Sequence, residues 1–209
     1  MKKFELTSEF VTNIFGTKLF RIRALIEFGG VKAGDVGGYV EKEENLDQDS
    51  DAWVSGNARV SGNARVYGDA EVYGNAEVSG DAWVSGDALV TGDARVYGNA
   101  LVTGNADYAT VKGFGRCNRN TTFFRCKDGK VRVVCGCFFG DMEEFRAIVK
   151  RTHGDGKLAK EYLAIADLME MHFCEAGGRK SIPEEFCINQ APPSPPASFG
   201  SVGGTMWRG

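Results

Sequence analysis

The side chains most able to do chemistry are basic residues just past the middle of the chain. The segment TTFFRCKDGKVRVV contains Asp128–Gly129, a strong signal for a β-hairpin with a two-residue loop. Such a loop pairs Lys127 with Lys130 and Arg125 with Arg132, so two arginines face each other across neighbouring strands. Like charges in this position are destabilising unless water or an anion screens them.

This pairing predicts a site for an anionic small molecule such as a nucleotide, because guanidinium groups bind phosphate and carboxylate oxygens. The candidate ligand-binding residues are Arg125, Arg132, Phe123, Lys127, Lys130, Arg116 and Arg119. The alternative is a basic hairpin face that is only solvated, as most surface charge runs are. The same pairing predicts a buried face made of Phe124, Cys126, Val131 and Val133.

The six cysteines lie between Cys117 and Cys187, and none forms a C-x-x-C pair. The intervals between Cys117, Cys126, Cys135 and Cys137 do not match common zinc modules, and Cys126 also fits the hairpin core. We therefore expect reduced thiols, no metal and no disulfide framework.

The composition of the whole chain limits its partners. A net charge of −3 and a pI near 5.5 give no electrostatic footprint for duplex nucleic acid. No stretch approaches the ~20 apolar residues of a membrane span, and the N-terminus MKKFELTSEF lacks the apolar run of a signal peptide. A cytoplasmic protein with no membrane partner is the expectation.

A six-residue repeat must position everything else. Alanine recurs every six residues from Ala52 to Ala106, and valine every six residues from Val54 to Val102. Residues two positions apart point to the same face of a short strand, and the Gly-Asn or Gly-Asp that follows forms a corner, because these residues adopt positive φ most easily. The repeat predicts coils of strand and corner with alanine and valine inside.

This pattern resembles the hexapeptide-repeat family, whose coils hold three hexapeptides, about eighteen residues, in a triangular prism with strands stacked at ~4.8 Å. The phase extends back to Val36, one coil below Val54, so the prism begins near Val31. The resemblance implies a mainly β fold: a left-handed parallel β-helix over residues 31–108, with an N-terminal β segment and a C-terminal β-hairpin plus two-helix module.

Stacking the coils sorts the outward side chains onto three faces. One face carries Arg59, Glu77 and Arg95, whose opposite charges indicate a solvated surface. The other two faces are unusually apolar and need cover, either from the chain's own termini or from other subunits. Hexapeptide-repeat proteins are usually trimers, so the resemblance favours a homotrimer. The candidate interface residues are Trp83, Leu101, Tyr67, Trp53, Leu89 and Tyr73.

Many members of this family are acyltransferases with a histidine base on a coil or its loop, and others are carbonic anhydrases with three histidine metal ligands. This chain has only His153 and His172, both outside the repeat, so one chain cannot supply three histidine ligands. Each falls near the end of a predicted helix, where a capping role is usual. We expect no catalytic residue and no cofactor.

The flanking segments predict smaller modules. Residues 1–30 form an N-terminal β cap, residues 109–175 form the β-hairpin and two helices, the first capped by Asp141, and the Pro-, Ser- and Gly-rich residues 176–209 form a flexible tail. The stretch from Lys18 to Leu46 resembles the opening of hexapeptide-repeat proteins common in phage and prophage genomes. A phage origin implies that the protein works in the host cytoplasm.

These features predict a non-catalytic, oligomeric binding protein of phage type, a counter-defence protein that sequesters an anionic, nucleotide-like signal. The alternative is a structural or protein-binding scaffold whose apolar columns contact a host or virion protein. A third hypothesis is a hexapeptide-repeat acyltransferase that uses a base other than histidine.

Overall fold

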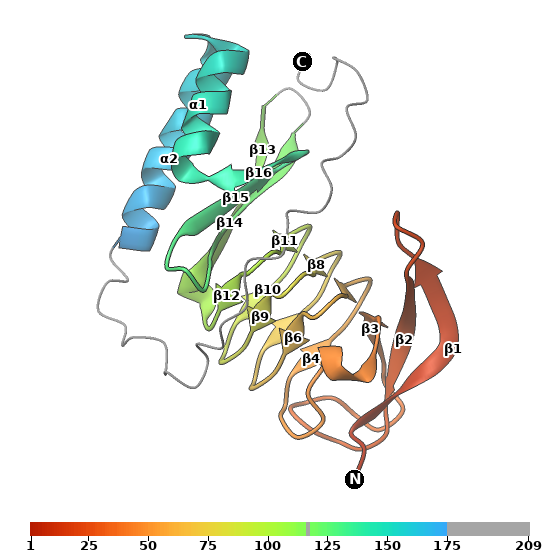
Figure 1. Cartoon of the computed structure of the whole chain (residues 1–209). Helices are drawn as coiled ribbons and strands as arrows, with labels where there is room; N and C mark the ends of the chain where they lie inside the picture. The colour runs from red at the N-terminus through yellow and green to blue at the C-terminus, as the bar shows by residue number, and fades with distance from the viewer. Residues whose placement is uncertain (116–117, 175–209) are drawn as a thin grey trace.

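A computed structural model describes residues 1–115 and 118–174. The chain is mainly β: a β-hairpin, a β-solenoid of about 4 turns, a four-stranded sheet and two C-terminal helices (Figure 1). The strands outside the coils are β1 (Phe4–Thr12), β2 (Lys18–Ala24), β3 (Val36–Val40), β13 (Tyr108–Phe114), β14 (Arg119–Arg125), β15 (Val131–Cys135) and β16 (Phe138–Asp141). The helices are α1 (Met142–His153), α2 (Lys157–Cys174) and the 3-10 turns η1 (Glu43–Asn45) and η2 (Asn105–Asp107). The predicted tail, 176–209, lies outside the described residues.

From Trp53 onward the solenoid is built from two-residue strands that pair in parallel with the strand eighteen residues away. The five-residue β3 pairs in parallel with β5 at a separation of twenty residues, Val40 with Val60. They form three faces: β3-β5-β8-β11, β4-β7-β10 and β6-β9-β12. The strands are β4 (Trp53–Val54), β5 (Arg59–Val60), β6 (Arg65–Val66), β7 (Glu71–Val72), β8 (Glu77–Val78), β9 (Trp83–Val84), β10 (Leu89–Val90), β11 (Arg95–Val96) and β12 (Leu101–Val102). The repeated alanines from Ala52 to Ala100 and the valines from Val54 to Val102 are all 0% exposed, which confirms the predicted phase over the repeat. The predicted extension of this phase back to Val36 is wrong: Val36 is 55% exposed, and it is Val40 that pairs with a repeat valine, Val60, because the first coil is two residues longer than the others.

The corner glycines allow the coils to stack closely. Gly86 has a φ of +62°, and a Cβ at this position would lie 2.2 Å from the carbonyl oxygen of Thr103 in the next coil. A larger residue would therefore strain the backbone and collide with its neighbour.

Polar side chains close the N-terminal end of the solenoid, where unpaired backbone groups would otherwise be left. The buried ammonium group of Lys3 donates to the carbonyl oxygens of Ser50 at 2.7 Å and Ala52 at 2.9 Å. Burial lowers the pKa of Lys3 to about 8. The fully buried Asn45 donates to the carbonyl oxygen of Ala64 at 2.8 Å.

The C-terminal end is closed in the same way by residues that follow the repeat. The side chain of Asn105 accepts a hydrogen bond from the Leu89 N–H at 2.9 Å, and Thr122 Oγ1 accepts from the Arg95 N–H at 3.1 Å. The last coil therefore presents few free backbone groups to another chain.

The C-terminal sheet is antiparallel, with the order β13-β14-β15-β16, and its two central strands contribute buried residues to a different core on each face. The face toward the helices carries Phe123, Val133 and Cys135, and the face toward the solenoid carries Phe124, Cys126 and Val134. The two predicted helices are present, and Asp141 caps α1 by accepting from the Glu144 N–H at 2.9 Å. Among the described residues, no helix has the length and apolarity that a membrane span requires.

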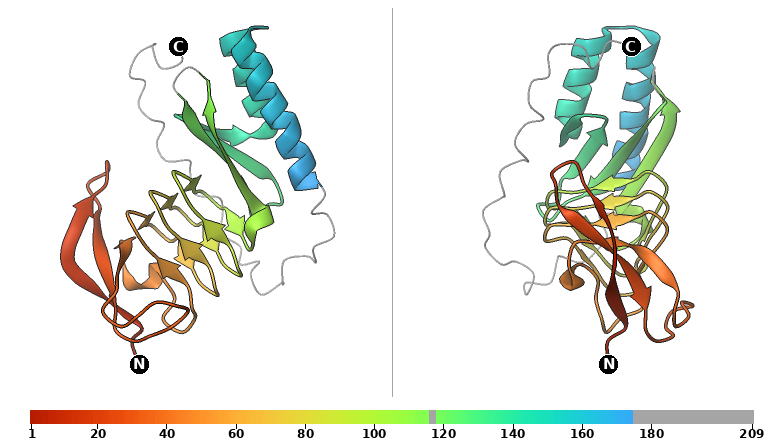
Figure 2. Two further views of the ribbon diagram at one scale, coloured as in Figure 1. Left: turned by 180° about the vertical axis from the view of Figure 1, so that it is seen from behind. Right: turned by 90° about the vertical axis from the view of Figure 1, so that its right-hand side faces the viewer.

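The β1–β2 hairpin and the C-terminal module stand at opposite ends of the solenoid and rise from the same side of it (Figures 1 and 2). Between them lies the outward side of β3, β5, β8 and β11, which we call the central face. Strands β2 and β1 continue this sheet beyond β3, in the order β1-β2-β3-β5-β8-β11. The central face therefore forms a floor that is flanked at both ends. We call the β1–β2 hairpin the β1–β2 wall and the C-terminal module the C-terminal wall.

Candidate functional site

The β14–β15 hairpin does not have the predicted register. Arg125 pairs with Val131 rather than with Arg132. The loop holds three residues instead of two, because the N–H of Cys126 donates to the carbonyl oxygen of Lys130 at 2.9 Å. The loop glycine, with a φ of +76°, supplies the left-handed residue that such a loop requires. Because side chains alternate between faces along a strand, Arg125 and Arg132 lie on opposite faces, and the predicted arginine pair is wrong.

The same shift divides the predicted buried face of the hairpin. Phe124 and Cys126 face the solenoid, whereas Val133 faces the helices together with Phe123. Phe123 is 0% exposed, so its ring is not accessible to a ligand base. The prediction of one buried and one open face was wrong because the solenoid and the helices cover one face each.

Arg125 has a structural role. Its Nη2 donates to the carbonyl oxygen of Phe173 at 2.6 Å, its Nε lies 3.4 Å from Asp107 Oδ1, and its guanidinium carbon lies 5.5 Å from the centroid of the Phe173 ring. The carboxylate of Asp107 is almost fully buried. Arg132 donates to Asp128 Oδ2 at 2.7 Å. Both arginines are therefore engaged within the chain.

The remaining basic residues of the predicted site do not converge. The ammonium group of Lys127 donates to the carbonyl oxygen of Asp81 at 2.8 Å and lies 4.0 Å from the centroid of the Trp83 ring. Burial lowers the pKa of Lys127. Lys130 and Arg119 are exposed, and Arg116 lies outside the described residues. Anion binding at the hairpin stays a prediction, without the arginine pair that motivated it.

The apolar columns of the solenoid are largely covered within the chain. Trp53 is only 8% exposed and packs against Phe28, with ring centroids 5.4 Å apart. Trp83 is half-buried beneath Lys127. The other predicted interface residues are half-buried as well: Leu101, Tyr67, Leu89 and Tyr73. Intrachain cover, the alternative to a trimer in the sequence argument, accounts for part of these columns, and the homotrimer itself stays a prediction.

The prominent exposed apolar residues lie elsewhere. Phe10, Ile14 and Phe15, at the turn of the β1–β2 hairpin, are 45%, 81% and 72% exposed. We call these three residues the hairpin tip. Sequence reasoning missed them, although three large apolar residues around the Asn13 turn were a visible signal.

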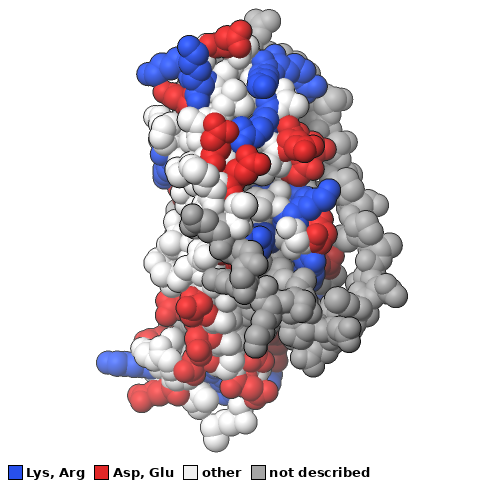
Figure 3. All heavy atoms as spheres, turned by 90° about the vertical axis from the view of Figure 1, so that its left-hand side faces the viewer, with Lys and Arg blue, Asp and Glu red and all other residues white. Residues whose placement is uncertain are grey.

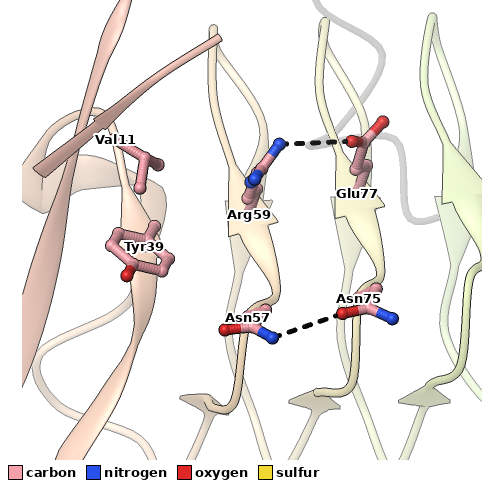
Figure 4. A pocket seen from close by; sticks show the side chains of 6 residues that line it. All are labelled: Val11, Tyr39, Asn57, Arg59, Asn75 and Glu77. Carbon is pink, nitrogen blue, oxygen red and sulfur yellow. Dashed lines mark hydrogen bonds and ion pairs between the residues drawn. The ribbon is translucent and has the colours of Figure 1, made fainter.

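A hollow of about 300 Å³ lies where the β1–β2 wall meets the central face (Figure 4). Val11 of β1 forms the wall side, and Tyr39 of β3 and the side chains of two stacked coils form the side that belongs to the central face. The lining residues are Val11, Tyr39, Asn57, Arg59, Asn75 and Glu77. Sequence reasoning predicted the charged column but not the hollow, because the position of β1 depends on the tertiary fold.

Two polar rows cross this hollow. In one row Glu77 lies between two arginines, 3.7 Å from Arg59 Nη1 and 3.6 Å from Arg95 Nε, which confirms the predicted charge column. In the other row the Asn57 amide donates to Asn75 at 3.4 Å (Figure 4).

The amide row continues to Asp93, which accepts from the Asn75 amide at 3.1 Å. Asp93 also accepts from the Lys112 ammonium group at 2.6 Å, and this hydrogen bond holds the pKa of Asp93 below its usual value. Lys112 belongs to β13, so the C-terminal wall is tied to the floor of the central face at this point.

The described thiols are not arranged for metal binding. Burial raises the pKa of Cys126 to about 12 and also raises the pKa of Cys135. Within residues 1–115 and 118–174, no three His, Cys, Asp or Glu side chains are grouped so that they could hold a metal ion. Cys117 and Cys187 lie outside these residues.

Charge is distributed unevenly over the side of the molecule that carries the helices. Acidic side chains gather toward the N-terminal end of the solenoid, whereas both signs are interspersed over the C-terminal module (Figure 3). No basic stripe of the kind that follows a nucleic-acid backbone runs along this side.

The comparisons with known proteins concern the repeat. A family model described as the YdcK beta solenoid repeat matches residues 52–68, 58–74 and 94–106. These segments all lie in the solenoid and make up a minor part of the chain, so the similarity concerns the coils and not the flanking modules. No curated protein matches the chain. The protein is a repeat protein with a β-solenoid, and its function has to be argued from its surfaces.

Proposed function

We propose that the protein is a non-catalytic scaffold that holds partner macromolecules, built on a left-handed hexapeptide-repeat solenoid of the type found in phage and prophage proteins. The proposed location is the cytoplasm. The six-residue phase of the buried alanines and valines supports the hexapeptide reading. The handedness and the phage origin are inferred from the resemblance of the repeat and of the Lys18–Leu46 stretch.

The observation that carries this proposal is the hairpin tip. Three large apolar side chains, 45% to 81% exposed, lie within six residues of each other at the end of the β1–β2 hairpin, while the apolar columns of the solenoid are largely covered. Clustered exposed apolar residues mark protein contact sites more often than scattered ones do. The tip lies at the end of the β1–β2 wall, so a partner reaches it without disturbing the solenoid core (Figure 1).

The capped solenoid suits this role. Lys3 and Asn45 at one end, and Asn105 and Thr122 at the other, occupy backbone groups that could otherwise pair with a further strand. A solenoid closed in this way resists end-to-end growth and keeps the surfaces that it carries at fixed distances.

The partner at the hairpin tip is proposed to be a second copy of this chain. Self-association through the Trp and Leu columns has less support, because the chain itself covers much of those side chains. A host or virion protein at the same tip is the alternative that the test must separate.

Light scattering after size exclusion, together with native mass spectrometry, tests this assignment. The double variant Ile14→Ser/Phe15→Ser is expected to convert an oligomer to monomer without changing the melting temperature, because these two side chains are 81% and 72% exposed in the single chain. Leu101→Ser, on a solenoid column, is the matched control. An oligomer that survives the tip variant but is lost with Leu101→Ser would contradict the assignment. A monomeric wild-type protein would overturn self-association and leave a heterologous partner.

Binding of a small anionic ligand is a second candidate function. The original site at Arg125 and Arg132 has lost its geometric basis, but the central face has two guanidinium groups for one carboxylate. Acyl transfer has the least support. Both histidines belong to the C-terminal helices, so the coils carry none, and no observation on the described residues favours another side chain as the base.

A further inference from the structure

We propose that the hollow beside Arg59 binds a carboxylate group carried on a small apolar body. This inference goes beyond the scaffold function and uses none of the hairpin-tip residues. Either proposal can therefore fail while the other holds.

The charge row of the central face lacks one negative charge. Arg59, Glu77 and Arg95 together carry two positive charges and one negative charge, and the three side chains are 41%, 44% and 51% exposed. Both contacts of Glu77 are ion pairs longer than 3.5 Å. A guanidinium group has five N–H donors, so most of the donors of Arg59 face the hollow or solvent.

Neighbouring charges do not cancel this excess. On the C-terminal side Lys112 and Asp93 pair with each other at 2.6 Å, and on the wall side Arg21 and Glu9 pair at 3.8 Å. Each of these pairs is neutral as a unit. The net positive charge therefore belongs to the row of Arg59, Glu77 and Arg95.

Glu77 has a second partner to which it can move. Because it already lies 3.6 Å from Arg95, a small rotation is enough to pair it fully with that arginine. Arg59 is then available to hold a ligand carboxylate through two parallel N–H···O bonds, the geometry that arginine favours. The ligand supplies the carboxylate that the row lacks.

The amide row adds a second donor beside Arg59. Asn57 uses one amide N–H for Asn75, at a long 3.4 Å, and its other N–H has no hydrogen-bond acceptor among the described residues. Asn57, in the corner that precedes β5, and Arg59, on β5, both line the hollow (Figure 4). A carboxylate lying between them accepts from both.

The wall side of the hollow determines what kind of group can carry the carboxylate. Val11 supplies the apolar surface beside the two polar rows, and Tyr39, only 8% exposed with the Arg21 guanidinium 4.8 Å from its ring centroid, closes the hollow next to it. The volume of about 300 Å³ lies at the lower end of the range of about 300–1,000 Å³ found for small-molecule sites. A small monocarboxylate with an aliphatic body and the C-terminal carboxylate of a peptide share this chemistry.

Nuclear magnetic resonance titration of the full chain, labelled with ¹⁵N, tests the site. N-acetyl-leucine is the carboxylate probe and N-acetyl-leucinamide is its neutral control. We expect saturable shifts of the Asn57 side-chain amide and the Arg59 Nε–H with the acid only. The expected dissociation constant is about 1 mM, as suits a ligand of this size in an open site. A leucine-terminated tetrapeptide, free and amidated, forms the second arm.

Three variants are expected to change the affinity for N-acetyl-leucine in different directions, and a fourth is their control. Arg59→Gln should weaken N-acetyl-leucine binding at least about tenfold, because it removes the main ligand contact. Glu77→Gln should strengthen binding several-fold, since it removes the competing anion. Arg95→Gln should weaken binding, because Glu77 then keeps only Arg59 as a partner. Arg65→Gln is the matched control, at the same repeat position on another face, and should leave binding unchanged.

The outcomes separate the two ligand sources and the failure of the proposal. Binding of the free tetrapeptide but not of N-acetyl-leucine would assign the site to chain termini, and binding of both would assign it to small carboxylates. The proposal is overturned if neither acid gives saturable shifts at ligand concentrations up to about ten times the expected dissociation constant. Equal shifts with acids and amides, or equal weakening by Arg65→Gln and Arg59→Gln, would also overturn it.

Discussion

Arg59 on the solenoid and Arg125 in the C-terminal module both lie on strands near a carboxylate, but their surroundings differ. The side chain of Arg59 is 41% exposed and shares Glu77 with Arg95. The side chain of Arg125 is 26% exposed and contacts the carboxylate of Asp107 and the carbonyl of Phe173, 48 residues away in the sequence.

The difference follows from the two architectures. An outward side chain of a solenoid coil meets mainly the residues directly above and below it, so its charge is balanced only if the repeat supplies the opposite charge. A residue in the C-terminal sheet meets helices and loops from distant parts of the chain. Spare charge is therefore expected on the outward faces of the solenoid, and paired charge where the module buries an ionic group, as at Arg125 and Asp107.

The largest expected effect is the loss of Arg125. Arg125→Gln should lower the free energy of unfolding by about 2–4 kcal/mol, because it removes a cation beside the nearly buried carboxylate of Asp107. Urea unfolding measures the loss. Arg119→Gln, an exposed arginine on the same strand, should change stability by less than about 0.5 kcal/mol. Equal losses from the two variants would remove the contrast between paired and spare arginines.

Lys3 is a third case to set beside Arg59 and Arg125, because its ammonium group is buried against carbonyl groups. Its pKa in the folded protein, about 8, lies below the ordinary value of 10.5, so the unfolded chain binds more protons between these two pH values. Stability should therefore rise as pH increases from about 8 to about 10.5, by at most about 3 kcal/mol, and this contribution should be constant below pH 8.

The difference in unfolding free energy between the wild type and Lys3→Met, measured in urea across this range, isolates the effect. The raised pKa of Cys126 acts in the opposite direction above pH 9, because the unfolded chain loses that proton first, but it is common to both proteins and cancels. A difference that does not change with pH would show that the Lys3 ammonium group is not buried as described.

The smallest expected effect is the loss of Arg59. Arg59→Gln should change the free energy of unfolding by less than about 0.5 kcal/mol, because exposed ion pairs contribute little. Urea unfolding beside Arg125→Gln gives the direct comparison, and Arg65→Gln on another face is the control. If Arg59→Gln destabilises the protein as much as Arg125→Gln does, Arg59 is a structural residue and the carboxylate site loses its basis.

Local patterns predicted the solenoid well. The inward direction of Ala58 and Val60 follows from the six-residue period alone, because each coil repeats the same environment. The cap of α1 was also predictable, since Asp141 accepts from a backbone N–H only three residues away. Both features depend on neighbours in sequence or on the repeat.

The hairpin register was not predictable in the same way. Asp128–Gly129 fits a two-residue or a three-residue loop, and the energy that separates these options lies in the packing of Phe123 and Phe124 on two different cores. One residue of shift moved Arg125 from a predicted ligand site to a structural contact. The cover of Trp53 by Phe28 likewise depended on where the N-terminal segment folds.

The sequence by itself determined the period of the coils, the identity of their buried residues and the charge column of the central face, because a repeat makes the environment of each position a function of its phase. Only the tertiary structure decided which faces are covered, which arginines are paired and where the hollow lies. These features depend on the docking of non-repeating segments, and the energy of that docking comes from contacts between residues far apart in the chain.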